Sequence, residues 1–160
     1  MTGVPVASIP RASTPPGGYG SEMPPPVLAG CVDPLVPGAP DLRGTWRVVE
    51  VVDGDGDPLP DDHPVHAHVE RIEQAADRLV VTGGGVVHDM VVDGTHENGV
   101  NDVMAADHAT PISVAASFED GALVLRPRDL PGVVVTRHLE GDRMVWHYAG
   151  VFVARLERSD

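Results

Sequence analysis

The sequence predicts an all-β protein, an antiparallel up-and-down β-barrel of 8–10 strands with a Pro-rich N-terminal arm. Three observations support this fold class. Residues 41–160 contain Val-rich runs of five to nine residues, Gly and Asp turns separate these runs, and no ten-residue segment shows the 3.6-residue period of a helix. Consecutive hairpins favour an up-and-down barrel, because closure of the sheet removes its exposed edges.

The expected strands follow one another from residue 45 to the end of the chain. They cover 45–52, 65–73, 78–83, 85–94, 99–104, 111–118, 122–127, 132–139 and 143–158, and the last run is long enough for two strands hinged at Ala149 and Gly150. Turn-forming sequences such as DGDGDP, EDG and EGD lie between runs. The count is therefore nine or ten strands.

Residues 1–40 form the arm, and residues 41–160 form the barrel. The arm holds ten of the 16 prolines, and its charged residues are Arg11, Glu22 and Asp33. Richness in Pro and Gly favours a disordered tail. The apolar residues between 27 and 36, Leu28 among them, favour instead a strap that lies across the barrel mouth as a candidate lid, since Pro lowers the entropy cost of ordering it.

Composition limits the partners of this protein. The formal net charge is −13, and every basic side chain is Arg because the sequence has no Lys. Such a surface repels phosphate backbones and anionic lipid, so we expect neither nucleic acid nor a membrane as a partner. The absence of Lys is typical of coding bias in a high-GC genome of the actinobacterial type.

The single cysteine, Cys31, ends the tetrapeptide LAGC, which has the form of a lipoprotein attachment site. Residues 1–26, however, contain seven prolines and no apolar run longer than three, whereas a lipoprotein signal needs an apolar region of roughly 7–15 residues. One cysteine forms no internal disulfide, and no run reaches the ~18 apolar residues of a membrane helix. We therefore predict a cytoplasmic protein.

Two stretches indicate a family. DLRGTWRVVEV (41–51) carries a G-x-W motif in Gly44 and Trp46, and TRHLEGDRMVWHYAGVFVARLER (136–158) carries an Arg strand, a tight turn and a second Arg strand. The first resembles the opening strand of lipocalins, and the second resembles the closing hairpin of the fatty-acid-binding proteins, both members of the calycin superfamily. The resemblance implies that Trp46 plugs one barrel end and that Arg137 and Arg155 hold a ligand carboxylate.

The sequence also departs from that family. Glu157 stands where the family has Tyr after the second Arg, and DGDGDPLPDDHP (53–64) replaces the two-helix lid. An alternative is that Arg137, Arg155 and Glu157 form an internal ion-pair network without a ligand role. We expect the barrel to bind a hydrophobic small molecule. Its candidate ligand-binding residues are Trp46, Arg155, Glu157, Trp146, Met144, Met90, Phe118 and Leu28.

The first functional hypothesis is a cofactor-free biosynthetic cyclase. The barrel, the arm and the genome type resemble the spirotetramate-forming 4+2 cyclases of high-GC bacteria. This resemblance implies that a hydrophobic polyketide-derived substrate is held for intramolecular cyclisation, with Tyr148, His147 and Arg137 polarising a carbonyl. The alternative is a non-catalytic carrier of a lipophilic carboxylate.

A third hypothesis is a heme-binding or metal-binding barrel that uses some of the eight histidines. His66 and His68 are expected on one strand face, with Glu70 and His88 as further ligands. The segment 93–111 is either an ordinary polar loop or a rim with a general acid or base. Its polar residues are His96, Glu97, Asn98, Asn101, Asp102 and His108. The favoured prediction is no metal and no cofactor, and the chain is a candidate for a homodimer.

Overall fold

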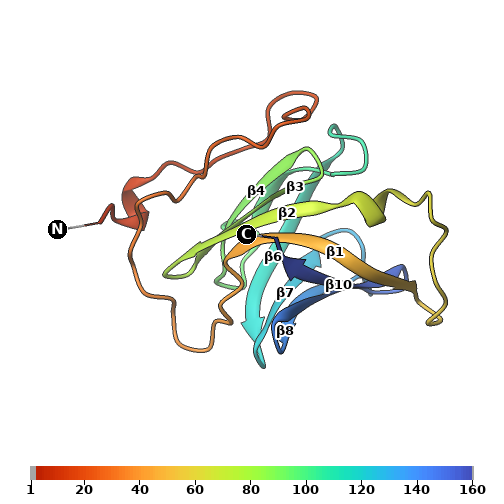
Figure 1. Cartoon of the computed structure of the whole chain (residues 1–160). Coiled ribbons are helices and arrows are strands. Elements are labelled where there is room, and N and C mark those ends of the chain that lie inside the picture. Colours follow the sequence, from red (N-terminus) through yellow and green to blue (C-terminus); the bar gives the residue numbers. More distant parts are fainter. Residues whose placement is uncertain (1–2, 160) are drawn as a thin grey trace.

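The computed structural model describes residues 3–159 and is almost entirely β-structure (Figure 1). The strands are β1 (Gly44–Asp53), β2 (Val69–Ala75), β3 (Arg78–Gly83), β4 (Val86–Val91), β5 (Val100–Val103), β6 (Pro111–Glu119), β7 (Ala122–Pro127), β8 (Val135–Glu140), β9 (Arg143–Tyr148) and β10 (Phe152–Arg158). Two short 3-10 turns accompany them, η1 (Val6–Ser8) and η2 (Pro64–Ala67). The predicted all-β fold class is confirmed.

All ten strands form one antiparallel sheet that curls into a nearly closed barrel. Its order is β4-β3-β2-β1-β10-β9-β8-β7-β6-β5, so each strand pairs with its neighbours in sequence, and β1 pairs with β10. Among strands that follow one another in sequence, β4 and β5 are the one pair without a shared strand ladder within the described residues. These two strands flank a seam, which is where the barrel is open along its side.

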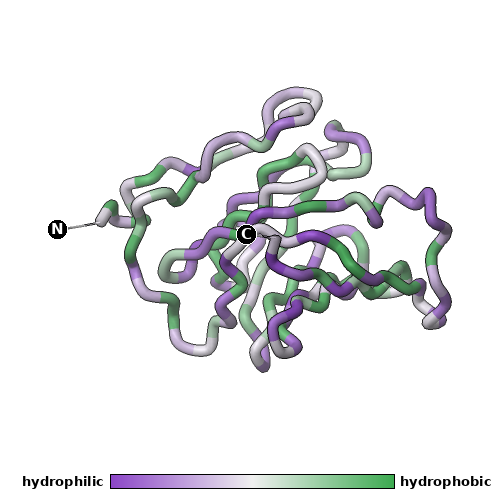
Figure 2. Tube along the Cα trace, in the orientation of Figure 1, coloured by the Kyte–Doolittle hydropathy of each residue, from purple (hydrophilic) through white to green (hydrophobic). Residues whose placement is uncertain are grey.

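The main core fills the barrel. Alternation along β10 sends Phe152, Ala154 and Leu156 inward, while Arg155 and Glu157 face outward. Hydrophobic and hydrophilic positions therefore interleave along the strands (Figure 2). Trp46 is completely buried, and its indole Nε1 donates to the carbonyl of Leu42 at 2.8 Å, which satisfies the one polar atom of that ring.

The arm lies on the outer face of β2, β3 and β4, beside the barrel rather than inside it (Figure 1). Leu28 packs there with Ala75, Val80 and Val87 in a second apolar cluster. The carboxylate of Glu73 on β2 accepts from the backbone N–H groups of Val27 and Leu28, at 3.1 and 2.7 Å. The structure thus differs from the expected strap across the mouth, because the apolar side chains of the arm are matched by an apolar outer face.

A buried ion pair anchors the arm. The guanidinium of Arg78 on β3 binds the carboxylate of Asp89 on β4 through two hydrogen bonds, of 2.9 and 2.6 Å. The remaining N–H groups of Arg78 donate to three arm carbonyls, those of Val6, Ile9 and Pro10. All five N–H groups of this side chain are therefore used.

The arm also bridges the seam. Arg11 donates to the carbonyls of Asp89, Asn98 and Gly99, which lie on the two sides of the opening. The Thr14 hydroxyl accepts from Val87 N of β4 at 2.9 Å, while Thr14 N donates to the carboxylate of Asp102 on β5. The arm thereby supplies cross-connections that the missing strand ladder does not.

Coverage on two sides explains an irregular pattern in the sequence. Every residue of β3 is buried, with Leu79 and Val81 facing the barrel core and Arg78 and Val80 facing the arm.

The structure also corrects the expected strand 65–73, which begins at Val69 because η2 occupies 64–67. None of the helical turns within residues 3–159 has the length and apolar character needed to cross a membrane.

Candidate functional site

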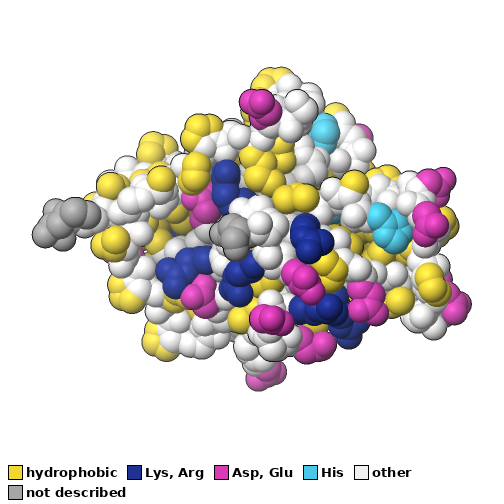
Figure 3. Space-filling model, in the orientation of Figure 1, with side chains coloured by type: hydrophobic (Ala, Val, Ile, Leu, Met, Phe, Trp, Pro, Cys, Tyr) yellow, Lys and Arg dark blue, Asp and Glu magenta, His cyan; other side chains and the backbone are white. Residues whose placement is uncertain are grey.

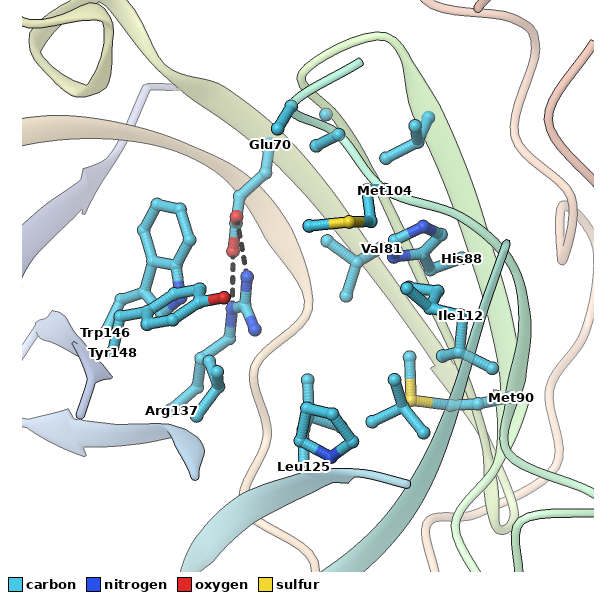
Figure 4. A pocket seen from close by; sticks show the side chains of 18 of the residues that line it. Glu70, Val81, His88, Met90, Met104, Ile112, Leu125, Arg137, Trp146 and Tyr148 are labelled. Carbon is cyan, nitrogen blue, oxygen red and sulfur yellow. Dashed lines mark hydrogen bonds and ion pairs between the residues drawn. The ribbon is translucent and has the colours of Figure 1, made fainter. Parts of the chain in front are cut away.

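A mostly apolar cavity of about 270 Å³ lies inside the barrel beside the seam (Figure 4). Its exposed lining residues, Ala105, Ala106 and Leu130, come from two loops and mark its mouth. The full lining is His68, Glu70, Val81, Gly83, Val86, His88, Met90, Val100, Met104, Ala105, Ala106, Ile112, Val114, Leu125, Pro127, Leu130, Val135, Arg137, Trp146 and Tyr148. A cavity of this kind is the expected place for a small ligand in a barrel.

The polar part of the cavity is a buried ion pair between opposite walls. Glu70 of β2 and Arg137 of β8 form two hydrogen bonds, Nε to Oε2 at 2.8 Å and Nη2 to Oε1 at 3.0 Å. Strand alternation directs both side chains inward. Gly83 of β3 faces Glu70, and a Cβ at that position would lie 2.8 Å from the Cβ of Glu70. Glycine thus makes room for the carboxylate side chain.

Aromatic rings and a histidine surround this pair. His68 Nε2 lies 2.8 Å from Glu70 Oε1, so the imidazole donates this hydrogen bond to the carboxylate. The guanidinium of Arg137 lies over the Trp146 ring at 4.9 Å, within cation–π distance. The His68 ring lies 4.8 Å from the same indole. The pair is therefore held in one orientation from several sides.

The Glu70 carboxylate is ionised. Burial by itself raises the pKa of Glu70, but the charge of Arg137 and the hydrogen bonds from His68 and Arg137 outweigh burial and lower the pKa from 4.5 to about 2. A positive and a negative charge therefore face each other without solvent between them.

Hydrogen-bond donors are in excess at this end of the cavity. Arg137 uses two of its five N–H groups on Glu70, and no described residue accepts from the other three. The buried Trp146 Nε1 likewise has no acceptor within residues 3–159. The Tyr148 hydroxyl points toward the Arg137 guanidinium (Figure 4). An acceptor placed here would meet the free N–H groups of Arg137.

The opposite wall is apolar and flexible in shape. Met90, Met104, Ile112 and Leu125 line it, facing the ion pair across the cavity (Figure 4). Methionine side chains adapt to irregular apolar shapes. This wall suits the hydrocarbon body of a ligand whose polar end lies at Arg137.

His88 lies where the cavity meets the seam. Its Nε2 is 2.9 Å from the carbonyl of Val103 on β5, so the side chain links β4 to β5 from inside the barrel. Burial lowers the pKa of His88, against the opposite effects of that carbonyl and of Asp102. His88 is therefore neutral and donates to the carbonyl of Val103. This hydrogen bond ties β4 to β5 across the seam.

Four of the candidate catalytic and ligand-binding residues line the cavity, and three of the candidate metal ligands, His68, Glu70 and His88, line it too. Arg137, Tyr148 and Trp146 stand at the polar end, and Met90 stands in the apolar wall. Three others, Trp46, Met144 and Phe118, belong to the core of the barrel but not to the cavity lining. Their side chains fill the rest of the interior.

The other predicted residues lie outside the barrel. His147 is exposed on the outer face of β9, and Leu28 packs beneath the arm. Arg155 pairs with Glu140, and Glu157 pairs with Arg143, on a face where acidic and basic side chains intermingle (Figure 3). The expected second arginine and its glutamate are therefore not near Arg137, because both occupy outward positions of β10.

The histidine arrangement also differs from the expectation. His66 lies in η2 and its Nε2 contacts the carbonyl of Pro60, so it shares no strand face with His68. Within residues 3–159 no group of three or more His, Cys, Asp or Glu side chains is placed to hold a metal ion. In the segment 93–111, Val100, Met104, Ala105 and Ala106 line the cavity, whereas its polar residues do not.

Sequence reasoning missed the role of Glu70 and most of the apolar wall. The sequence pattern predicts Glu70 only as a further metal ligand, whereas in the structure it is the partner of Arg137. Its position in the sequence did carry a signal, because an acidic residue stands among the inward positions 70, 72 and 74 of β2. Met104, Ile112 and Leu125 carried no comparable signal.

Comparison with solved structures supports the barrel fold. Human cRBP IV, a cellular retinol-binding protein, superposes with a TM-score of 0.54 at 16% sequence identity, covering 74% of this chain and 98% of that protein. No family model matches the sequence, and no curated protein matches it. The prediction of a calycin-like barrel is confirmed at the level of fold.

Proposed function

We propose that this protein binds a small hydrophobic molecule inside the barrel, with the polar end of the ligand at Arg137 and Tyr148. One observation carries the proposal, the three N–H groups of Arg137 that have no acceptor among the described residues and lie at one end of an apolar cavity. Arg137 lines the cavity, so the acceptor atom of a bound ligand could pair with these donors inside the barrel.

The fold comparison is consistent with this proposal. Human cRBP IV has a name that describes retinol binding, and its barrel resembles this one. The apolar wall of Met90, Met104, Ile112 and Leu125 would contact the hydrocarbon part of the ligand. Burial of such a surface contributes about 25 cal/mol for each Å² removed from water.

A fluorescence titration tests the proposal. Nile red, an uncharged apolar dye, is added to the protein and to two variants that carry the same substitution at different places. Leu125→Trp fills the cavity, whereas Val153→Trp places the same ring on the outer face of β10. We expect Leu125→Trp to weaken dye binding about tenfold, which corresponds to ~1.4 kcal/mol, and Val153→Trp to leave it unchanged. Equal effects of both variants, or no dye binding by the wild type, would contradict the proposal.

A second function is favoured by the same donors. The N–H groups of Arg137 and the hydroxyl of Tyr148 are suited to polarise a carbonyl of the bound molecule. With a folded polyene held against the apolar wall, this would accelerate an intramolecular 4+2 cyclisation without a cofactor. Carrier and cyclase differ in one measurement, the rate at which a linear polyene with an activated carbonyl is converted in the presence of wild type and of Arg137→Gln. A rate equal to that in buffer supports the carrier.

A further inference from the structure

We propose that Glu70 determines the class of ligand, so that the cavity takes an uncharged molecule with a hydrogen-bond acceptor, such as a ketone, aldehyde or ester carbonyl, and discriminates against carboxylates. This inference rests on the proposed function, the binding of a hydrophobic molecule in the barrel. It adds the chemical class of the polar end of the ligand, and it assigns the selection of that class to Glu70.

The charge balance of the site disfavours a carboxylate ligand. The side chain of Glu70 is fully buried and that of Arg137 is 6% exposed, and their two hydrogen bonds make the pair electrically neutral. A carboxylate bound at Arg137 would lie beside the Glu70 carboxylate and bring one uncompensated negative charge into the barrel. Burying an unpaired charge is strongly unfavourable. An uncharged carbonyl avoids both the repulsion and this desolvation cost.

The hydrogen bonds of the site favour a ligand that accepts. Both oxygens of Glu70 already accept, Oε1 from His68 and Arg137 and Oε2 from Arg137. The groups that remain at Arg137 are donors, its three free N–H groups. A ligand that only accepts satisfies these donors without leaving a hydrogen of its own unpaired.

The position of Glu70 is itself built into the barrel. Gly83 on the paired strand leaves the space next to the Glu70 side chain, and any larger residue there would approach the Glu70 Cβ to 2.8 Å. His68 also holds the carboxylate, through a 2.8 Å hydrogen bond to Oε1, the oxygen that accepts from Arg137 Nη2. The counter-charge is thus held in place before any ligand binds.

The decisive experiment compares two probes with the same chain length, 2-decanone and decanoate, by isothermal titration calorimetry at pH 8. For the wild type we expect 2-decanone to bind at least about tenfold more tightly than decanoate, a difference of ~1.4 kcal/mol. Equal binding, or tighter binding of decanoate, would overturn the role of Glu70 and leave the proposed function intact. Binding of neither probe would instead contradict the proposed function.

The variant Glu70→Gln keeps the shape of the side chain and removes its charge. Arg137 then lacks a counter-ion, and a carboxylate ligand supplies one, so decanoate should bind at least about tenfold more tightly than to the wild type. The ratio of decanoate affinity to 2-decanone affinity should rise by the same factor or more, and this ratio is the readout. Decanoate should also raise the melting temperature of Glu70→Gln more than that of the wild type, because a ligand that binds only the folded state stabilises it.

Two controls isolate the effect. Glu73→Gln removes one negative charge from the same strand on its outer face, under the arm, and should not improve decanoate binding. The double variant Glu70→Gln/Arg137→Gln removes both charges and should also show no gain. A gain in either control would overturn the inference, since the gain would then reflect overall charge or altered packing. If Glu70→Gln does not fold, the ratio of the two probes in the wild type still decides the inference.

Discussion

Two buried arginine–carboxylate pairs lie on the outer and inner sides of the barrel wall. They differ in the number of arginine N–H groups that remain without an acceptor. Arg78 and Asp89 form a two-bond pair outside the barrel, and Arg137 and Glu70 form a two-bond pair inside it. Arg78 uses its three other N–H groups on carbonyls of the arm, whereas no described residue accepts from the three of Arg137. The saturated pair holds structure together, and the unsaturated pair is the ligand site that we propose.

The largest effect is expected from breaking the saturated pair. Asp89→Asn leaves the charge of Arg78 buried without a counter-ion and removes the carboxylate that accepts from Ala12 N. We expect the free energy of unfolding to fall by about 3–5 kcal/mol, measured by urea denaturation. Asp142→Asn, in the exposed turn between β8 and β9, should change it by less than about 0.5 kcal/mol. An unfolding free energy unchanged by Asp89→Asn would show that the outer pair does not anchor the fold.

An intermediate effect is expected from acid on the inner pair. The pKa of Glu70 falls from 4.5 in the unfolded chain to about 2 in the folded protein, so its ionised form contributes stability above pH 4.5 that is lost as the pH falls toward 2. Between pH 6 and pH 3 this loss is about 2 kcal/mol. Glu70→Gln lacks it, while all other carboxylates titrate in both proteins. The difference in unfolding free energy between wild type and Glu70→Gln should therefore shrink over this range, and parallel pH profiles would contradict the assignment.

The smallest effect is expected where the arm bridges the seam. Thr14→Val removes the hydroxyl that accepts from Val87 N and costs about 1 kcal/mol. Amide hydrogen exchange at Val87 should accelerate. Ser8→Ala removes a hydroxyl whose bond stays within the arm, to the carbonyl of Pro5, and should leave Val87 unaffected. Unchanged exchange in Thr14→Val would mean that the arm does not protect the seam.

The strand layout could be predicted from the sequence because most strands have one face in the core and one in solvent. On β10 the alternation of Phe152, Arg155 and Leu156 indicates the inner and outer positions directly. On β3 it does not, because the arm buries the outer face and all six residues are buried. When every residue of a strand is buried, the alternation of apolar and polar residues no longer distinguishes the inner face from the outer face. The position of the arm on the outer face could therefore not be predicted from the sequence.

The site was only partly predictable, for a related reason. Arg137 and Tyr148 could be selected because polar residues on closing strands must face either solvent or a partner. The partner of Arg137 is 67 residues away, on a strand that the sheet order places four strands from β8. Contact across the interior of a barrel depends on its curvature, which local sequence does not encode. Arg155 carried the same sequence signal as Arg137 but occupies an outward position.

A crystal structure of the protein with 2-decanone bound would show where the polar end of the ligand lies. We expect the ketone oxygen about 3 Å from a free N–H nitrogen of Arg137, with Glu70 still paired and the alkyl chain against Met90, Ile112 and Leu125. A ketone oxygen that points to the mouth at Leu130, or a ligand bound under the arm instead of in the barrel, would contradict this expectation.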